Sequence, residues 1–296
     1  MKCLDKIKLN YINHEVFANT TQLYLEMGKN YQYQKTFEKN LERISLDVAN
    51  LNAEYFHRLF FSKSFMIKEN RYKSLLYDSS VAGNKGEQLY KNLLFIFRRI
   101  HSPESGNFSL ELSEISNLAN LLFKDVFTKE RLKYRSLSKK RGLFFNEGMS
   151  LREELERYLE TLNSLVRERK IEMIFLYLNF FVDFINLQVY DFNENESLGL
   201  LIFYVLMVEY NFQAAHYISF FQKFYLYQDE FAEIMKLIEI QSKQGTADLM
   251  PLMNFFIKLF SGVYVDLKDL ARDYQYDEDL TISKTDYVEN TIGKLG

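Results

Sequence analysis

Three carboxylates lie close together between the two most apolar stretches of the chain. Asp191, Glu194 and Glu196 fall within six residues, and hard divalent cations take oxygen ligands of this kind. The same segment also fits the start of a helix, with Asn193 as the N-cap and Glu196 three residues later as its partner. A cap accounts for these residues without a ligand. The sequence therefore predicts a cap and assigns no metal site, with a bound cation as the alternative.

The densest basic stretch lies earlier in the chain and contains Lys133, Arg135, Lys139, Lys140 and Arg141. A solvated loop is the plainer interpretation of such a run. The functional interpretation is a docking site for an acidic or extended segment of a partner. The whole chain carries 37 Lys and Arg against 40 Asp and Glu, for a net charge of −3, and this balance does not indicate a general nucleic-acid binder.

Cysteine and histidine provide little chemistry. The single cysteine, Cys3, cannot form an internal disulfide or a thiolate metal cluster. The four histidines, at positions 14, 57, 101 and 216, show no metal-ligand spacing. One cysteine favours a reducing compartment, and we expect a cytoplasmic protein.

The sequence predicts that the elements which position these residues are helices. The chain has 2 Pro and 11 Gly among 296 residues, and 47% of its residues are hydrophobic, so long helices with short connections are expected. Apolar periodicity predicts helices over 112–123, 150–163, 173–190 and 193–209, and Ser150 with Glu153 fits a capping box at the start of the second. Residues 173–190 are apolar nearly all round, as in a central buried helix. The predicted fold class is therefore all-α. Neither of the two most apolar stretches, 173–190 and 198–208, is suited to crossing a membrane.

The order of these segments, over roughly residues 70–268, resembles the Fic (Fido) family. Members of that family typically transfer AMP from ATP to a hydroxyl group of a target protein. The resemblance implies a Fic-like helical domain over 71–270 with central buried helices and a possible short flap hairpin. It also implies an N-terminal helical extension over 1–70, packed on the core, and a polar tail over 271–296.

Two pieces before the central helices carry part of the resemblance. The stretch Ser79-Ser80-Val81-Ala82-Gly83-Asn84 resembles the inhibitory helix of many members, although it is one residue shorter and lacks the inhibitory Glu. The residues that resemble this inhibitory helix are Ser79, Ser80, Gly83 and Asn84. The run from Leu132 to Ser136 resembles the segment that enters the flap, which clamps the target peptide. The flap and partner-binding candidates are Tyr134, Arg135, Ser136, Lys139, Lys140 and Arg141.

The active-site motif is where this sequence departs from the family. The family pattern is His-Pro-Phe-x-[Asp/Glu]-Gly-Asn-Gly-Arg-x-x-Arg, in which the His is the general base and the Arg residues hold phosphates. Here the corresponding region, 189–200, contains neither His nor Arg, and Arg is absent from 171 to 271. The motif-loop candidates are Asp191, Phe192, Asn193, Glu194, Asn195, Glu196, Ser197 and Gly199, and none is assigned a catalytic role.

The sequence leaves three functions open. The first is a Fic-like protein without transfer chemistry that binds a protein partner, or holds a nucleotide without turnover. The second is an active, divergent adenylyl- or phosphotransferase that uses ATP with Mg²⁺, with Asp191 or Glu194 as the base. The third is a helical interaction protein unrelated to the family. No oligomeric state is indicated.

Overall fold

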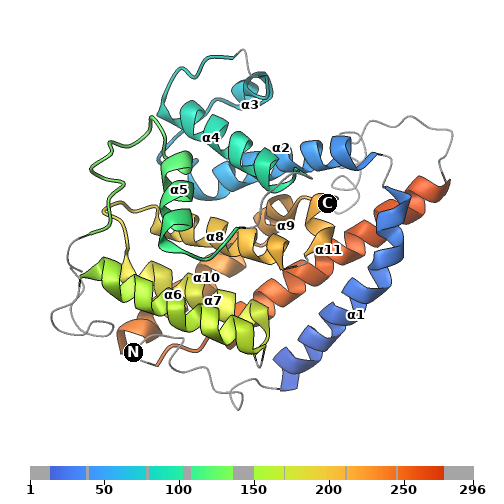
Figure 1. Ribbon diagram of the computed structural model, residues 1–296. Helices are drawn as coiled ribbons and strands as arrows, with labels where there is room; N and C mark the ends of the chain where they lie inside the picture. The colour runs from blue at the N-terminus through green and yellow to red at the C-terminus, as the bar shows by residue number, and fades with distance from the viewer. Residues whose placement is uncertain are drawn as a thin grey trace.

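The computed structural model describes residues 14–37, 40–77, 80–102, 108–135, 150–169, 171–210, 212–244 and 246–276. These residues form helices and connections, without a strand, which confirms the predicted all-α class (Figure 1). In chain order the elements are α1 (His14–Thr36), α2 (Leu41–Phe60), α3 (Glu69–Leu75), α4 (Lys85–Ile100), α5 (Leu112–Leu122), α6 (Leu151–Glu168), α7 (Met173–Leu187), α8 (Asn195–Glu209), the 3₁₀ helix η4 (Gln213–His216), α9 (Phe220–Leu226), α10 (Gln228–Gln244) and α11 (Met250–Tyr276).

Helices α7 and α8 form the centre of the fold, as expected, and they pack against each other. Both are buried along almost their whole length. Gly199 in α8 permits the close approach, because a Cβ atom there would lie 3.1 Å from Cδ1 of Phe184 and 3.3 Å from Cδ2 of Phe181. Helix α7 ends three residues earlier than predicted, where Gln188 adopts a left-handed conformation with φ of 46°.

The other helices surround this pair. Helix α1 lies along α11, α2 packs on α4 and α9, and α6 runs beside α7 (Figure 1). A single hydrophobic core contains side chains from α1 through α11, from Val16 to Ala271. The N-terminal helices thus share their core with the rest of the chain, while the domain boundaries at residues 70 and 270 stay predictions.

Local signals fix several helix starts. The capping box between Ser150 and Glu153 is present, with the Ser150 side chain and the Glu153 carboxylate each accepting from the other residue's backbone N–H. Helix α6 continues five residues beyond its predicted end, to Glu168. No helix in the described part of the chain is both long enough and apolar enough to cross a membrane.

Candidate functional site

The turn between α7 and α8, which contains the predicted motif-loop candidates, lies against the segment predicted to enter the flap. Tyr134 and Tyr190 form an isolated antiparallel bridge, and the backbone N–H of Arg135 donates to the carbonyl of Val189 at 3.1 Å. The fold therefore brings the two predicted segments together. A flap hairpin is not described, because Ser136, Lys139, Lys140 and Arg141 lie outside the described residues.

Aromatic stacking fixes the turn on α5. The ring of Tyr190 lies 5.1 Å from that of Tyr134 and 5.1 Å from that of Phe192, and Phe192 packs 4.8 Å from Phe123. The Tyr134 hydroxyl donates to the carbonyl of Leu112 at 2.8 Å. Tyr190 and Phe192 are both buried, so this part of the turn is core and faces no solvent.

The side chain of Asn195 locks the turn from inside. Its Oδ1 accepts from the N–H of Tyr190 at 3.1 Å, and its Nδ2 donates to the carbonyls of Tyr190 at 3.0 Å and Phe192 at 2.6 Å. The predicted cap at Asn193 is wrong, because Asn193 is exposed and α8 begins at Asn195, after Glu194 at the N-cap position. A buried amide that satisfies three backbone groups stabilises the turn more than a cap in solvent would.

An ion pair closes the outer side of the turn. Nη2 of Arg135 lies 2.9 Å from Oδ1 of Asp191, and Nη1 of Arg135 lies 3.4 Å from Oε1 of Gln188. The Arg135 side chain is mostly buried, with 14% of it exposed, whereas the Asp191 side chain is 67% exposed. The carboxylate of Asp191 is thus occupied by a cation of the protein itself.

The remaining acids of the turn differ in their surroundings. Burial, with a contribution from Glu239, raises the pKa of the Glu196 carboxyl. Oε2 of Glu194 is buried and has no hydrogen-bond partner among the described residues, while Ser197 donates its hydroxyl to the backbone carbonyl of Glu194 at 2.8 Å. Within the described ranges no three His, Cys, Asp or Glu side chains are grouped so that they could hold a metal ion.

Gly199 does not have the role of a phosphate-binding glycine. It lies within α8, and its missing side chain makes room for the rings of Phe181 and Phe184. Glycines of a phosphate loop instead expose backbone N–H groups to the ligand. Of the motif-loop candidates, Asn195 holds the turn, Asp191 pairs with Arg135, and Gly199 packs the central helices.

The described part of the stretch predicted to resemble the inhibitory helix is not helical before α4. Ser80 to Gly83 precede α4, and Asn84 is the N-cap of α4, with its side chain accepting from the N–H of Glu87 at 2.9 Å. Ser79 lies outside the described residues. An Asn three residues before a Glu is a capping signal, and this spacing could have placed the start of α4 from the sequence.

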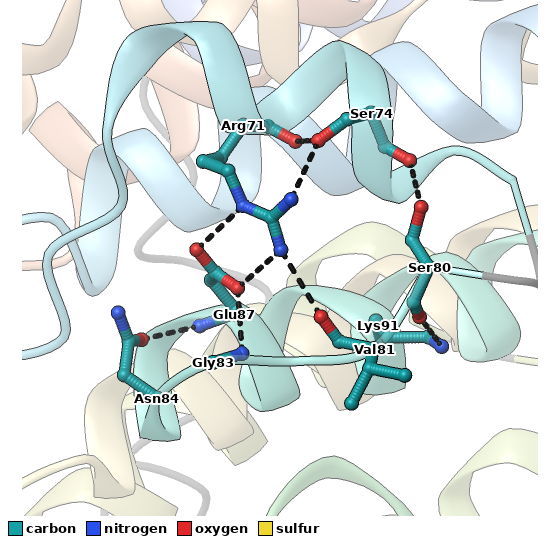
Figure 2. Close-up of polar contacts among 8 residues, drawn as sticks. All are labelled: Arg71, Ser74, Ser80, Val81, Gly83, Asn84, Glu87 and Lys91. Carbon is teal, nitrogen blue, oxygen red and sulfur yellow. Dashed lines mark hydrogen bonds and ion pairs between the residues drawn. The ribbon is translucent and has the colours of Figure 1, made fainter.

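Glu87, which is not among the candidate residues predicted from the sequence, organises this stretch (Figure 2). Arg71 donates from Nε to Oε1 of Glu87 at 2.9 Å and from Nη2 to Oε2 at 2.8 Å. Oε2 of Glu87 also accepts from the N–H of Gly83 at 2.7 Å, and Nη2 of Arg71 reaches the carbonyl of Val81 at 3.0 Å. Hydrogen bonding to Arg71 lowers the pKa of the Glu87 carboxyl to about 2 against the effect of burial, with further help from the N–H of Gly83.

This cluster is separate from the α7–α8 turn. In the described part of the chain, no hydrogen bond or ion pair joins residues 80–87 to residues 188–197. The cluster fastens the connection between α3 and α4 through Arg71, Glu87 and Lys91, whose Nζ donates to the carbonyl of Ser80 at 2.7 Å. These contacts hold the α3–α4 connection in place, which is a structural role.

A groove of about 1380 Å³ adjoins the segment predicted to enter the flap. It is lined by α5, by the chain from Lys124 to Arg135, by the C-terminal ends of α4 and α8, and by the start of α6. Tyr134 and Arg135 are among the lining residues, so the groove adjoins the α7–α8 turn through the ion pair with Asp191.

Comparison with known proteins agrees with the helical layout. No family model matches the chain, and no curated protein matches it. The fold is similar to that of a Fic family protein from Desulfovibrio desulfuricans G20, with a TM-score of 0.62 and 11% sequence identity, over 88% of this chain and 75% of that one. The chain therefore has a Fic-like helical fold.

Proposed function

We propose that this chain is a Fic-fold protein that does not transfer AMP by the family mechanism and acts by binding a protein partner. The observation that carries the proposal is the closed α7–α8 turn. Asn195 satisfies three backbone groups of that turn, and Arg135 pairs with Asp191 across it.

The missing residues support the same conclusion. Neither His nor Arg occurs in 189–200. A general base contributes about 10²–10⁴-fold to a proton-transfer step. A single donor that stabilises developing charge contributes about 10²–10³-fold. A site that lacks both has little of the family's transition-state stabilisation.

The electrostatics of the turn also oppose a triphosphate. Glu194 and Glu196 lie at the start of α8, where a phosphate would otherwise meet free N–H groups and the positive end of the helix dipole. The cation beside the turn, Arg135, is already paired with Asp191. A nucleotide would have to displace that carboxylate before it could use the guanidinium.

One observation favours the alternative of a divergent adenylyl- or phosphotransferase. Oε2 of Glu194 is buried without a hydrogen-bond partner among the described residues, and a carboxylate in that condition could accept a proton from a hydroxyl group. In that case ATP with Mg²⁺ would be the donor and lysines would hold the phosphates. The third possibility, a helical protein unrelated to Fic, is disfavoured by the similarity in fold.

Labelling distinguishes the first two functions. The protein is incubated with ATP labelled at the α-phosphate, with Mg²⁺ or Mn²⁺ and a cell lysate, and labelled proteins are separated by mass. We expect no labelled protein, and no heat of binding when the protein is titrated with millimolar ATP and Mg²⁺. Labelling that disappears in Glu194→Gln, but persists in the exposed control Glu233→Gln, would establish the transferase instead.

A further inference from the structure

The groove beside α5 is more basic than the rest of the molecule. Six cationic residues line it against three acidic ones, Glu114, Asp125 and Glu209, although the whole chain has a net charge of −3. The cations are Arg99, Lys124, Lys129, Lys133, Arg135 and Arg152. Positive charge is thus concentrated on one concave surface.

Most of these cations are available to a ligand. Arg135 is paired with Asp191, but among the described residues no ion pair joins any of the other five to a carboxylate. The pKa of the Glu130 carboxyl is lowered mainly by hydrogen bonds from its own backbone N–H and from Thr128. The positive charges of Lys133 and Lys129 lower it further. Arg99, Lys124, Lys129, Lys133 and Arg152 are all exposed.

The groove also offers apolar surface between the charges. Five partly exposed apolar side chains line it, Ile100, Phe108, Leu121, Phe127 and Leu132, whereas the lining residues Ile96, Leu118 and Val205 are buried. Exposed apolar surface in a concave site is typical of a site that receives a partner. A ligand that fits must therefore carry both negative charge and apolar side chains.

The dimensions and the three acids narrow the choice. The volume of about 1380 Å³ exceeds the ~300–1,000 Å³ of small-molecule pockets, so a chain segment fits better than a metabolite. A nucleic acid presents a negative charge about every 1.7 Å along a duplex, and Glu114, Asp125 and Glu209 would repel it. A peptide can place its acidic residues beside the lysines and its apolar residues against the leucines.

We infer that this groove binds an acidic, amphipathic segment of a partner protein. The inference deepens the proposed function, because it names the chemistry and the place of the partner. Binding energy would come from burial of apolar residues, whereas the lysines and arginines would provide specificity and salt dependence.

Fluorescence anisotropy with the full chain tests the inference. The probe is a short labelled peptide in which Asp and Glu alternate with Leu and Val. Three matched probes replace the acids by Asn and Gln, replace the Leu and Val by Ala, or consist of oligodeoxythymidine. We expect only the acidic, apolar peptide to bind tightly, and we expect its affinity to fall as salt is raised.

Charge reversal locates the binding site. The triple variant Lys124→Glu, Lys129→Glu, Lys133→Glu should bind the acidic peptide with an affinity at least about tenfold lower than that of the parent protein. A matched triple on α10 and α11, Lys236→Glu, Lys258→Glu, Lys268→Glu, should bind as the parent does, because these exposed lysines lie outside the groove. Circular dichroism checks the fold of both, and the milder set of Lys→Gln changes should give an intermediate loss if the reversed set unfolds.

Several results would overturn the inference. One is an equal loss of affinity for the acidic peptide in the two triple variants, and another is no binding of that peptide by the parent protein. The others are binding of the Asn/Gln or Ala peptide as tight as that of the acidic, apolar peptide, and binding of oligodeoxythymidine tighter than that of the acidic, apolar peptide. None of these bears on AMP transfer, which the labelling experiment tests separately. Failure of the groove proposal and failure of the proposed function are thus distinguishable.

Discussion

Arg135 and Asp191, 56 residues apart in the chain, join the segment predicted to enter the flap to the α7–α8 turn through a guanidinium–carboxylate contact of 2.9 Å. The backbone of Arg135 adds a second tie, since its N–H donates to the carbonyl of Val189 at 3.1 Å. One residue thus holds the turn through both its side chain and its main chain. The contact also links the turn to the basic groove, which Arg135 helps to line.

A double-mutant cycle measures how much this ion pair contributes. Because 67% of the Asp191 side chain is exposed, solvent screens the pair, and the coupling free energy between Arg135→Ala and Asp191→Ala should be about 0.5–1 kcal/mol. Urea unfolding of the parent, both single variants and the double variant gives this value. The exposed pair Lys243–Glu239 within α10 is the control, with an expected coupling of about 0.3–0.5 kcal/mol. A coupling no larger than that of the control would contradict a special role for Arg135.

The two asparagines at the start of α8 should differ in their effect on stability. Asn195→Ala removes three hydrogen bonds and leaves backbone groups of Tyr190 and Phe192 buried without partners, so we expect a loss of about 2–3 kcal/mol. Asn193→Ala changes an exposed side chain and should cost less than about 0.5 kcal/mol. Denaturant midpoints at equal m-values provide the comparison. Equal losses for the two variants would show that the turn is not held by Asn195.

Two glycines in helices should respond to alanine in opposite directions. A Cβ atom at Gly86 would lie 2.6 Å from the backbone oxygen of Phe65, so Gly86→Ala must displace the backbone, at a cost of about 2 kcal/mol or more. At Gly28, in the middle of α1, no atom lies within 4 Å of the added Cβ. Gly28→Ala should therefore stabilise the protein by about 0.5–1 kcal/mol.

Thermal unfolding of both glycine variants tests the pair. A stabilised Gly86→Ala protein would mean that the connection before α3, which contains Phe65, yields to α4 at little cost. A destabilised Gly28→Ala protein would mean that α1 needs the flexibility of glycine at that point.

The buried His57 should make the fold sensitive to mild acid. Burial, and secondly the charge of Arg58, lower the pKa of His57 from 6.5 to about 4. Its Nδ1 lies 2.8 Å from the hydroxyl of Tyr72, and the ring of Tyr90 lies 6.1 Å away. Because the folded pKa is the lower one, the contribution to stability is fully present above the unfolded pKa of 6.5. It is lost as the pH falls from 6.5 toward 4.

Between about pH 7 and pH 5 this single group should remove about 2 kcal/mol of the free energy of unfolding. His57→Gln should flatten that part of the stability profile, measured by urea unfolding at a series of pH values. Burial also lowers the pKa values of His101 and His216, so some acid sensitivity should remain. A profile unchanged by His57→Gln would show that His57 does not control it.

The all-α fold class and the positions of several helices could be predicted from local sequence. The spacing of apolar residues predicted α5 to within one residue and placed α7 and α8 as adjacent buried helices, and Ser150 with Glu153 predicted the start of α6. These features depend on residues within a few positions of each other, which the sequence displays directly. The run Asn193-Glu194-Asn195-Glu196, in contrast, offers two asparagines in equivalent local settings.

The sequence alone therefore determined an all-helical chain and a stretch, 189–200, without His or Arg. Only the tertiary structure decided that Asn195 locks the turn, that Asp191 meets Arg135, and that Glu87 pairs with Arg71 before α4. The physical reason is distance along the chain. Helix periodicity and caps arise from neighbours in sequence, whereas burial and the pairing of residues 16 or 56 positions apart depend on how the helices pack.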